Sequence, residues 1–177
     1  MNLPNKLSIA RALCIPVIVI LLYLSDPTCR IIAGIVFILA CLTDFFDGRI
    51  ARKRNLVTDF GKFIDPVADK LLVLTTLIML NHMKLMDAWI VIVILCRELS
   101  VDGLRMVAVT KGKVIAASPL GKWKTTCQMV LISLMLILNL SVYQVWPITV
   151  LAMITVFMTL FSAVDYFVLN ASVISEK

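Results

Sequence analysis

Residues 44–52 read DFFDGRIAR and residues 61–70 read GKFIDPVADK, so four aspartates stand in pairs within a largely apolar part of the chain. The members of each pair are three or four residues apart, which places both carboxylates on one side of an α-helix. The short connection between the two stretches predicts that the two helices are antiparallel neighbours. We therefore expect four carboxylates to converge, namely those of Asp44, Asp47, Asp65 and Asp69.

The composition around this segment is that of a membrane protein. The chain has 177 residues, of which 61% are hydrophobic and 16% are charged, and its mean hydropathy is +1.01. Soluble domains average about 45–50% apolar and about 25% charged residues. The composition therefore excludes an ordinary soluble enzyme and a disordered protein. The net charge of +6 indicates basic residues held at a membrane surface rather than a nucleic-acid partner.

Six apolar segments have lengths near the roughly 20 residues that cross a hydrocarbon core. Backbone groups in lipid must be satisfied within the segment, so the sequence predicts an all-α integral membrane protein. Residues 1–177 are expected to form a single transmembrane domain, because the spans leave no room for a second one. The predicted spans are 7–25, 29–50, 63–81, 86–108, 119–140 and 146–170.

The basic residues fall almost entirely on one side of these predicted spans. Only Arg30 and Lys84 fall on the other side. Cytoplasmic loops of membrane proteins carry an excess of Lys and Arg, so both termini are expected in the cytoplasm. The aspartate pairs lie near the same side. The sequence therefore predicts a multi-pass protein whose site faces the cytoplasm.

Four converging carboxylates cannot all stay ionised in a low-dielectric site without compensation. Two divalent cations would balance the four negative charges, and hard oxygen ligands suit Mg²⁺ or Mn²⁺ rather than zinc. The alternative is a set of structural hydrogen bonds between helices. That alternative is reasonable for a single intramembrane acid, but four acids on adjoining helices favour a site with two metal ions.

The two stretches together resemble the motif of the CDP-alcohol phosphotransferase family, D-x2-D-G-x2-A-R-x8-G-x3-D-x3-D. The resemblance implies a six-helix bundle that transfers a phosphatidyl-type group from a CDP-linked lipid to an alcohol and releases CMP. It also implies that the four aspartates hold two divalent metals and that Asp69 is in addition the general base. The positions matched to the lining of the CDP-lipid site are Gly48, Ala51, Arg52 and Gly61.

The chemistry that this resemblance implies agrees with the residues present. Metals that bridge a pyrophosphate neutralise the charge that develops on it, and a carboxylate beside the acceptor hydroxyl can take its proton. The expected step is a direct attack of that hydroxyl on the lipid-side phosphorus. A covalent intermediate stays open at this point.

Segments outside the motif resemble the bacterial inner-membrane members of the family that use sn-glycerol 3-phosphate as acceptor and CDP-diacylglycerol as donor. These segments are residues 2–11, 97–105 and 117–129. Cations predicted near the cytoplasmic ends of the fourth and fifth spans independently favour an acceptor with a phosphate group. They are Arg97, Arg105, Lys122 and Lys124.

Each of these assignments has an alternative. Arg105 has Glu98 and Asp102 nearby on its own helix and can pair with them instead, and Lys124 can be an interfacial lysine that reaches the headgroups. A sibling enzyme would use inositol phosphate or serine as acceptor. From other classes, a divalent-cation transporter would place acids toward both membrane faces and show an internal repeat, and neither pattern is present. A role as a structural assembly partner is disfavoured, because four carboxylates would then lower the stability of the protein without any gain. The sequence leaves open whether the protein forms a homodimer.

Overall fold

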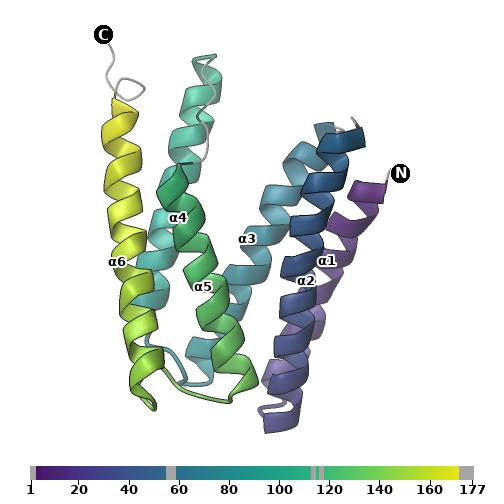
Figure 1. The fold of residues 1–177 in the computed structure, drawn as a ribbon, viewed down its shortest axis with the longest axis vertical. Helices are drawn as coiled ribbons and strands as arrows, with labels where there is room; N and C mark the ends of the chain where they lie inside the picture. The colour runs from purple at the N-terminus through teal and green to yellow at the C-terminus, as the bar shows by residue number, and fades with distance from the viewer. Residues whose placement is uncertain (1–2, 55–58, 113–114, 116–117, 172–177) are drawn as a thin grey trace. The chain divides into compact units, whose positions relative to one another are not determined.

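The computed structural model describes residues 3–54, 59–112, 115 and 118–171 of the chain. Within these ranges, side chains are described for residues 8–43 and from Val67 onward. The described part contains six α-helices and no strand (Figure 1). The helices are α1 (Leu3–Tyr23), α2 (Pro27–Arg54), α3 (Asp59–His82), α4 (Ala88–Thr110), α5 (Pro119–Ile137) and α6 (Trp146–Leu169).

The all-α prediction is confirmed, and each predicted segment coincides with one helix. The boundaries have local causes. The carboxylate of Asp26 accepts hydrogen bonds from the backbone N–H groups of Thr28 and Cys29 at 2.9 and 3.3 Å. Asp26 therefore caps the start of α2, in which Pro27 is the first residue. Helix α5 ends earlier than predicted, because Asn139 adopts the left-handed conformation (φ 53°) in which helices commonly terminate.

Helix α6 is the most apolar helix of the structure. Among the described residues it is long and apolar enough to cross a membrane, with a mean hydropathy of 2.1. Within the residues whose side chains are described, α1 and α2 contribute the apolar stretches Ser8–Tyr23 and Pro27–Thr43. In α2 the apolar run stops where the charged residues of 44–54 begin. For the described residues, helix length and composition support one span, and the six-span topology is a prediction.

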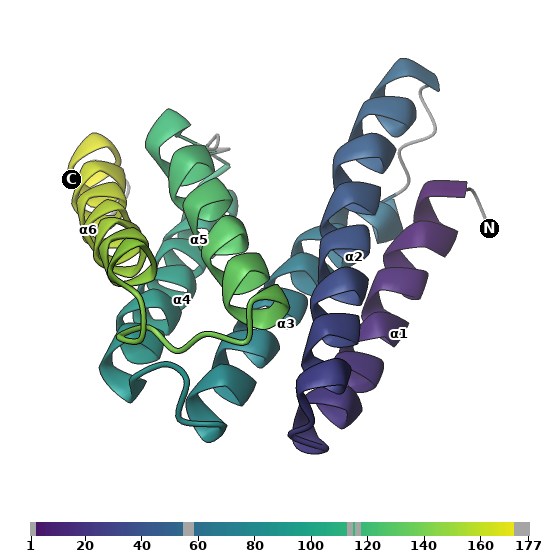
Figure 2. The ribbon, with the colours of Figure 1, turned by 60° about the horizontal axis from the view of Figure 1, so that its bottom comes forward.

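One compact unit comprises residues 1–86 together with 132–141. In this unit α1 packs against both α2 and α3, as Figures 1 and 2 show. Gly34 of α2 lets the end of α5 approach, because a Cβ at that position would lie 3.0 Å from side-chain atoms of Leu136 and Ile137. The start of α1, the end of α2 and the start of α3 lie at the same end of this unit (Figure 1). The motif residues therefore occupy one end of the three-helix packing.

The second compact unit comprises residues 87–131 and 142–177. Helix α4 packs against α6, and Val101, Leu104, Ala108 and Tyr166 form a buried cluster between them. In the loop before α6, the hydroxyl of Tyr143 donates a 2.7 Å hydrogen bond to Asp87. This bond and the negative charge of Asp87 raise the pKa of Tyr143.

The exposed and buried faces of α6 reverse the pattern of a soluble helix. Thr155, Thr159 and Ser162 are buried on one face of the helix, and the hydroxyls of the two threonines donate to backbone carbonyls one turn earlier. Its large apolar side chains are exposed, among them Phe157, Phe161, Val164 and Val168. Exposed apolar and buried small polar side chains are typical of a helix surrounded by lipid.

Candidate functional site: a carboxylate motif and a buried polar cluster

The carboxylate motif lies in the first unit, in the last part of α2 and the first half of α3. The positions in α2 are Asp44, Asp47, Gly48, Ala51 and Arg52, and those in α3 are Gly61, Asp65 and Asp69. The prediction that both stretches are helical is thus confirmed. Except for Asp69, the side chains of these residues lie outside the described ones. The convergence of the four carboxylates therefore stays a prediction.

Asp69 is held by an arginine from another helix. The Nη1 atom of Arg11, in α1, donates a hydrogen bond to Oδ1 of Asp69 at 2.8 Å. The side chain of Arg11 is 1% exposed and that of Asp69 is 29% exposed. An ion pair with one buried partner fixes the carboxylate more firmly than a fully solvated pair does, because solvent screens it less.

From the sequence, Arg11 is predicted only as one of the cytoplasmic basic residues, and its contact with Asp69 is not predicted. The available signal is the position of Arg11 inside an apolar stretch, where a charge needs a partner. Which carboxylate that partner would be depends on how α1 packs against α3, and the sequence does not state it.

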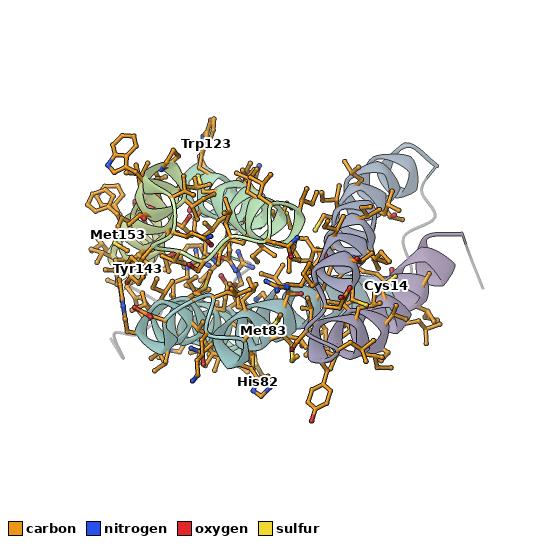
Figure 3. The ribbon with its side chains drawn as sticks, turned by 90° about the horizontal axis from the view of Figure 1, so that it is seen from below. Cys14, His82, Met83, Trp123, Tyr143 and Met153 are labelled. Atoms are coloured by element: carbon orange, nitrogen blue, oxygen red, sulfur yellow. The ribbon has the colours of Figure 1, made fainter. Side chains whose placement is uncertain are left out.

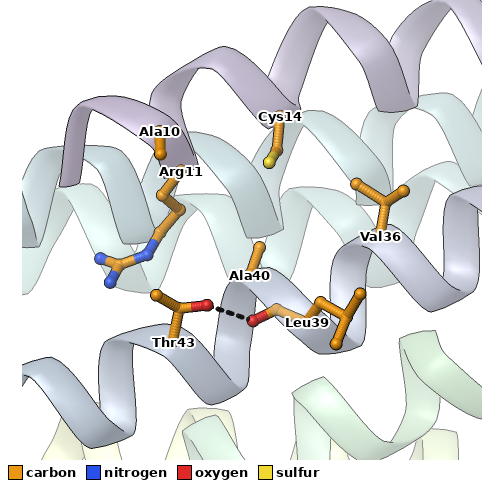
Figure 4. A pocket seen from close by; sticks show the side chains of 7 residues that line it. All are labelled: Ala10, Arg11, Cys14, Val36, Leu39, Ala40 and Thr43. Atoms are coloured by element: carbon orange, nitrogen blue, oxygen red, sulfur yellow. Dashed lines mark hydrogen bonds between the residues drawn. The ribbon is translucent and has the colours of Figure 1, made fainter. Parts of the chain in front are cut away.

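A pocket of about 310 Å³ lies between α1 and α2, beside this ion pair (Figure 4). Its lining is mostly apolar, with Arg11 as the charged member. The hydroxyl of Thr43, the residue before Asp44, donates to the carbonyl of Leu39 at 2.6 Å and so has its hydrogen bond within the helix. The lining residues are Ala10, Arg11, Cys14, Val36, Leu39, Ala40 and Thr43. The pocket therefore suits an apolar group next to the motif.

In the second unit, polar side chains of three helices form what we call the polar cluster. It consists of Arg97 and Glu98 of α4, Lys124 of α5 and Ser162 of α6, together with Gln128, which lies on the same face of α5 as Lys124. Oε1 of Glu98 accepts hydrogen bonds from Nζ of Lys124 and, at 3.3 Å, from Nη1 of Arg97. Nη2 of Arg97 donates to Oγ of Ser162 at 2.6 Å. The exposed side-chain fractions are 2% for Lys124, 9% for Arg97 and 12% for Glu98.

One face of α5 carries the residues that contribute to this cluster or leave room for it. Gly121, Lys124 and Gln128 are three and four residues apart and so share a face of the helix. A Cβ at Gly121 would lie 3.4 Å from Nη2 of Arg97, so the glycine leaves room for the guanidinium group. Trp123 projects outward from α5 and is 63% exposed (Figure 3).

The other two predicted acceptor cations have different surroundings. Nε of Arg105 donates to the hydroxyl of Tyr166 at 2.7 Å, and its guanidinium carbon lies 5.3 Å from the centre of that ring. Lys122 is exposed on α5. The structure thus brings Arg97 and Lys124 together and attaches Arg105 to α6. Sequence reasoning named Glu98 only as an alternative partner of Arg105, and it missed Ser162 and Tyr166 as partners of the cations.

The fold and the motif define a class of protein. Residues 1–171 match the family described as CDP-alcohol phosphatidyltransferase, and the chain belongs to this family. The chain is 44% identical to the CDP-diacylglycerol–glycerol-3-phosphate 3-phosphatidyltransferase of Bacillus subtilis, covering 96% of this chain and 95% of the relative. It is 46% identical to the protein of the same name from Rickettsia bellii, covering 77% and 75%. It is 37% identical to a probable phosphatidylglycerophosphate synthase of Mycobacterium tuberculosis, covering 93% and 79%.

Proposed function

We propose that this protein transfers the phosphatidyl group of CDP-diacylglycerol to sn-glycerol 3-phosphate, forming phosphatidylglycerophosphate and CMP. The names of its relatives from Bacillus subtilis and Rickettsia bellii state this donor and this acceptor for those proteins. The structural observation that carries the proposal is the polar cluster. There, the carboxylate of Glu98 accepts hydrogen bonds from two buried cations, Arg97 and Lys124. Two cations held side by side favour an acceptor that carries a phosphate.

The donor side of the proposed reaction uses the carboxylate motif. The motif supplies only carboxylate oxygens, and its described member, Asp69, is partly exposed and thus open to a ligand. This donor set fits two hard divalent cations, Mg²⁺ or Mn²⁺, on Asp44, Asp47, Asp65 and Asp69. When bound, the ions supply charge neutralisation for the diphosphate. The residues proposed to line the CDP-lipid site are Gly48, Ala51, Arg52 and Gly61.

The proposed chemistry assigns the proton to Asp69. The acceptor hydroxyl gives its proton to this carboxylate as its oxygen attacks the lipid-side phosphorus, and CMP leaves. Arg11 holds the carboxylate in one orientation during this step. Arg97 and Lys124 bind the acceptor phosphate, and Arg105 and Lys122 contribute positive charge nearby.

The proposed location is the cytoplasmic membrane of a bacterium, with six spans and with both termini and the site facing the cytoplasm. Two observations support it. The exposed apolar face of α6 is suited to lipid. The helix ends that carry the motif lie at the end of the first unit where α1 begins, and of the basic residues only Arg30 and Lys84 fall on the side that the sequence predicts to be external.

Enzymes that use another acceptor are the main alternative. An inositol phosphate acceptor would also need the positive charge of the polar cluster, whereas serine, which has no phosphate, would need it less. A cation transporter is disfavoured by membership in a transferase family. A homodimer is compatible with each of these alternatives.

The deciding experiment offers the purified protein CDP-diacylglycerol and Mg²⁺ and measures CMP release with three acceptors in separate reactions. We expect release with sn-glycerol 3-phosphate, and release below one tenth of that rate with inositol phosphate or serine. Release with either of the other two acceptors, and none with sn-glycerol 3-phosphate, would contradict the proposed acceptor. Absence of release with all three would contradict the proposed activity.

A further inference from the structure

The side chain of Gln128, in α5, has a buried oxygen atom that forms no hydrogen bond with the residues that the structure describes. The residue is 2% exposed. Its side-chain oxygen Oε1 has no hydrogen-bond partner among the residues that the structure describes. A buried amide oxygen without a partner costs about 1–3 kcal/mol, so proteins rarely keep one without a purpose.

The position of Gln128 connects this oxygen with the polar cluster. Gln128 follows Lys124 by four residues, about 6 Å along the helix, and lies on the same face. Side chains of an α-helix lean toward its N-terminus, so that of Gln128 leans toward Lys124 and Gly121. The spacing is comparable with the length of a three-carbon alkyl phosphate.

The unused atoms of the polar cluster complement such a ligand. Nη1 and Nη2 of Arg97 are bound to Glu98 and Ser162, while its buried Nε has no partner among the described residues. That N–H is a donor, which a phosphate oxygen needs. Oε1 of Gln128 is an acceptor, which a hydroxyl group needs. A donor and an acceptor on neighbouring turns thus fit a molecule with a phosphate at one end and a hydroxyl further along.

We propose that Gln128 accepts a hydrogen bond from the hydroxyl of the acceptor that does not react, and thereby selects hydroxylated alkyl phosphates. This inference rests on the proposed function. In the proposed transfer the primary hydroxyl at C1 reacts, so the hydroxyl that remains for Gln128 is the one at C2 of sn-glycerol 3-phosphate. Gln128 is then a specificity-determining residue, and it was absent from the sites that the motif predicts.

The test compares two acceptors that differ only in that hydroxyl. They are sn-glycerol 3-phosphate and 3-hydroxypropyl phosphate, offered to the full-length protein with CDP-diacylglycerol and Mg²⁺. For the unmodified protein we expect kcat/KM, measured by CMP release, to be about tenfold lower with 3-hydroxypropyl phosphate, because Gln128 then lacks its partner. Failure to use sn-glycerol 3-phosphate at all would overturn the proposed function; equal use of both acceptors would overturn only the role of Gln128.

Substitution of Gln128 completes the comparison. Gln128→Met keeps the length of the side chain and removes the oxygen, so the difference between the two acceptors should fall below about twofold. Gln128→Glu keeps an acceptor oxygen but adds a negative charge, so both acceptors should be used less well while the tenfold ratio is retained. A loss of equal size for both acceptors in Gln128→Met would show a structural role and would overturn the proposal.

Thr155→Val provides the matched control. Thr155 is a buried polar residue of the same unit, but its hydroxyl already donates to the carbonyl of Leu151 at 2.8 Å. Removing this hydroxyl should leave the ratio between the two acceptors at about tenfold. A ratio that collapsed in Thr155→Val as it does in Gln128→Met would show that loss of any buried polar group changes acceptor choice, and the proposal would fail.

Discussion

The two units of the molecule handle buried positive charge in different ways. In the first unit, one arginine, Arg11, binds one carboxylate, that of Asp69. In the second unit, two cations, Arg97 and Lys124, bind the single carboxylate of Glu98. The bond from Arg11 orients the carboxylate of Asp69. The bonds to Glu98 hold two buried cations beside each other on neighbouring helices. The first arrangement suits a base that must be positioned, and the second suits the binding of an anion.

The largest effect on kcat is expected for Asp69, the proposed base in the first unit. Asp69→Asn should lower kcat for CMP release about 10³-fold, because the amide cannot take the proton of the acceptor hydroxyl. Binding of CDP-diacylglycerol, measured by equilibrium dialysis, should survive. Asp26→Asn is the control, since Asp26 is an exposed helix-capping residue. If Asp69→Asn abolished donor binding to the same degree as turnover, Asp69 would be chiefly a metal ligand rather than the base.

The next effect tests the buried cations of the second unit. Lys124→Met removes one of the two positive charges proposed to bind the acceptor phosphate, so kcat/KM for sn-glycerol 3-phosphate should fall about 100-fold. The KM for CDP-diacylglycerol should stay within about twofold. Initial rates with each substrate varied in turn measure both.

Lys122→Met is the matched control for this charge, because Lys122 is on the same helix but exposed. Its effect should stay within about threefold and weaken further as salt is added. Equal effects of Lys122→Met and Lys124→Met would break the comparison, since burial would then not distinguish the two lysines.

A third effect concerns the positioning pair. Arg11→Gln should lower kcat about tenfold, because Asp69 loses the group that orients it. The free energy of unfolding should fall by less than the roughly 3–5 kcal/mol typical of a broken buried pair, since Asp69 is partly exposed. Kinetics and thermal unfolding in detergent measure the two quantities.

Arg11→Lys separates positioning from stability. It should restore the stability more fully than kcat, because a lysine supplies the charge but not the planar guanidinium geometry. Arg30→Gln, at a partly buried arginine near the start of α2, is the control and should leave kcat unchanged. An Arg11→Gln protein that lost stability but kept its full kcat would reduce Arg11 to a structural role.

The smallest effect probes the space around Arg97. Gly121→Ala places a Cβ 3.4 Å from Nη2 of Arg97, so the guanidinium must shift by a few tenths of an ångström. We expect a two- to threefold rise in the KM for the acceptor. Gly103→Ala, on α4, meets no described atom within 4 Å and should instead stabilise the protein by about 0.5–1 kcal/mol. A larger rise in the KM for the acceptor in Gly103→Ala than in Gly121→Ala would show that Gly121 does not serve to make room for the guanidinium group of Arg97.

Much of the fold follows from local features of the sequence. Runs of apolar residues predicted all six helices, and the N-cap formed by Asp26 and the break near Asn139 are local as well. The residues that follow Thr43 continue α2 to Arg54, and the span predicted over 29–50 stays a prediction.

The site was predictable only where its residues are close in sequence. The carboxylate motif is read from the spacing between Asp44 and Asp69, and spacing within one helix translates directly into a shared face. The polar cluster combines residues up to 65 positions apart, and Arg11 lies 58 positions from Asp69. No periodicity reports such pairs, because they depend on how helices pack.

The sequence by itself determined the six helices, the segregation of basic residues and the carboxylate motif, since each depends on neighbouring residues or on simple periodicity. The tertiary structure alone decided the partners of the charged side chains: Arg11 with Asp69, Arg97 and Lys124 with Glu98, and Arg105 with Tyr166 instead of an acid on its own helix. It also decided that Gln128 is buried without a partner among the described residues. The physical reason is that a buried polar group takes whatever partner helix packing places within about 3 Å, and packing is a property of the whole chain.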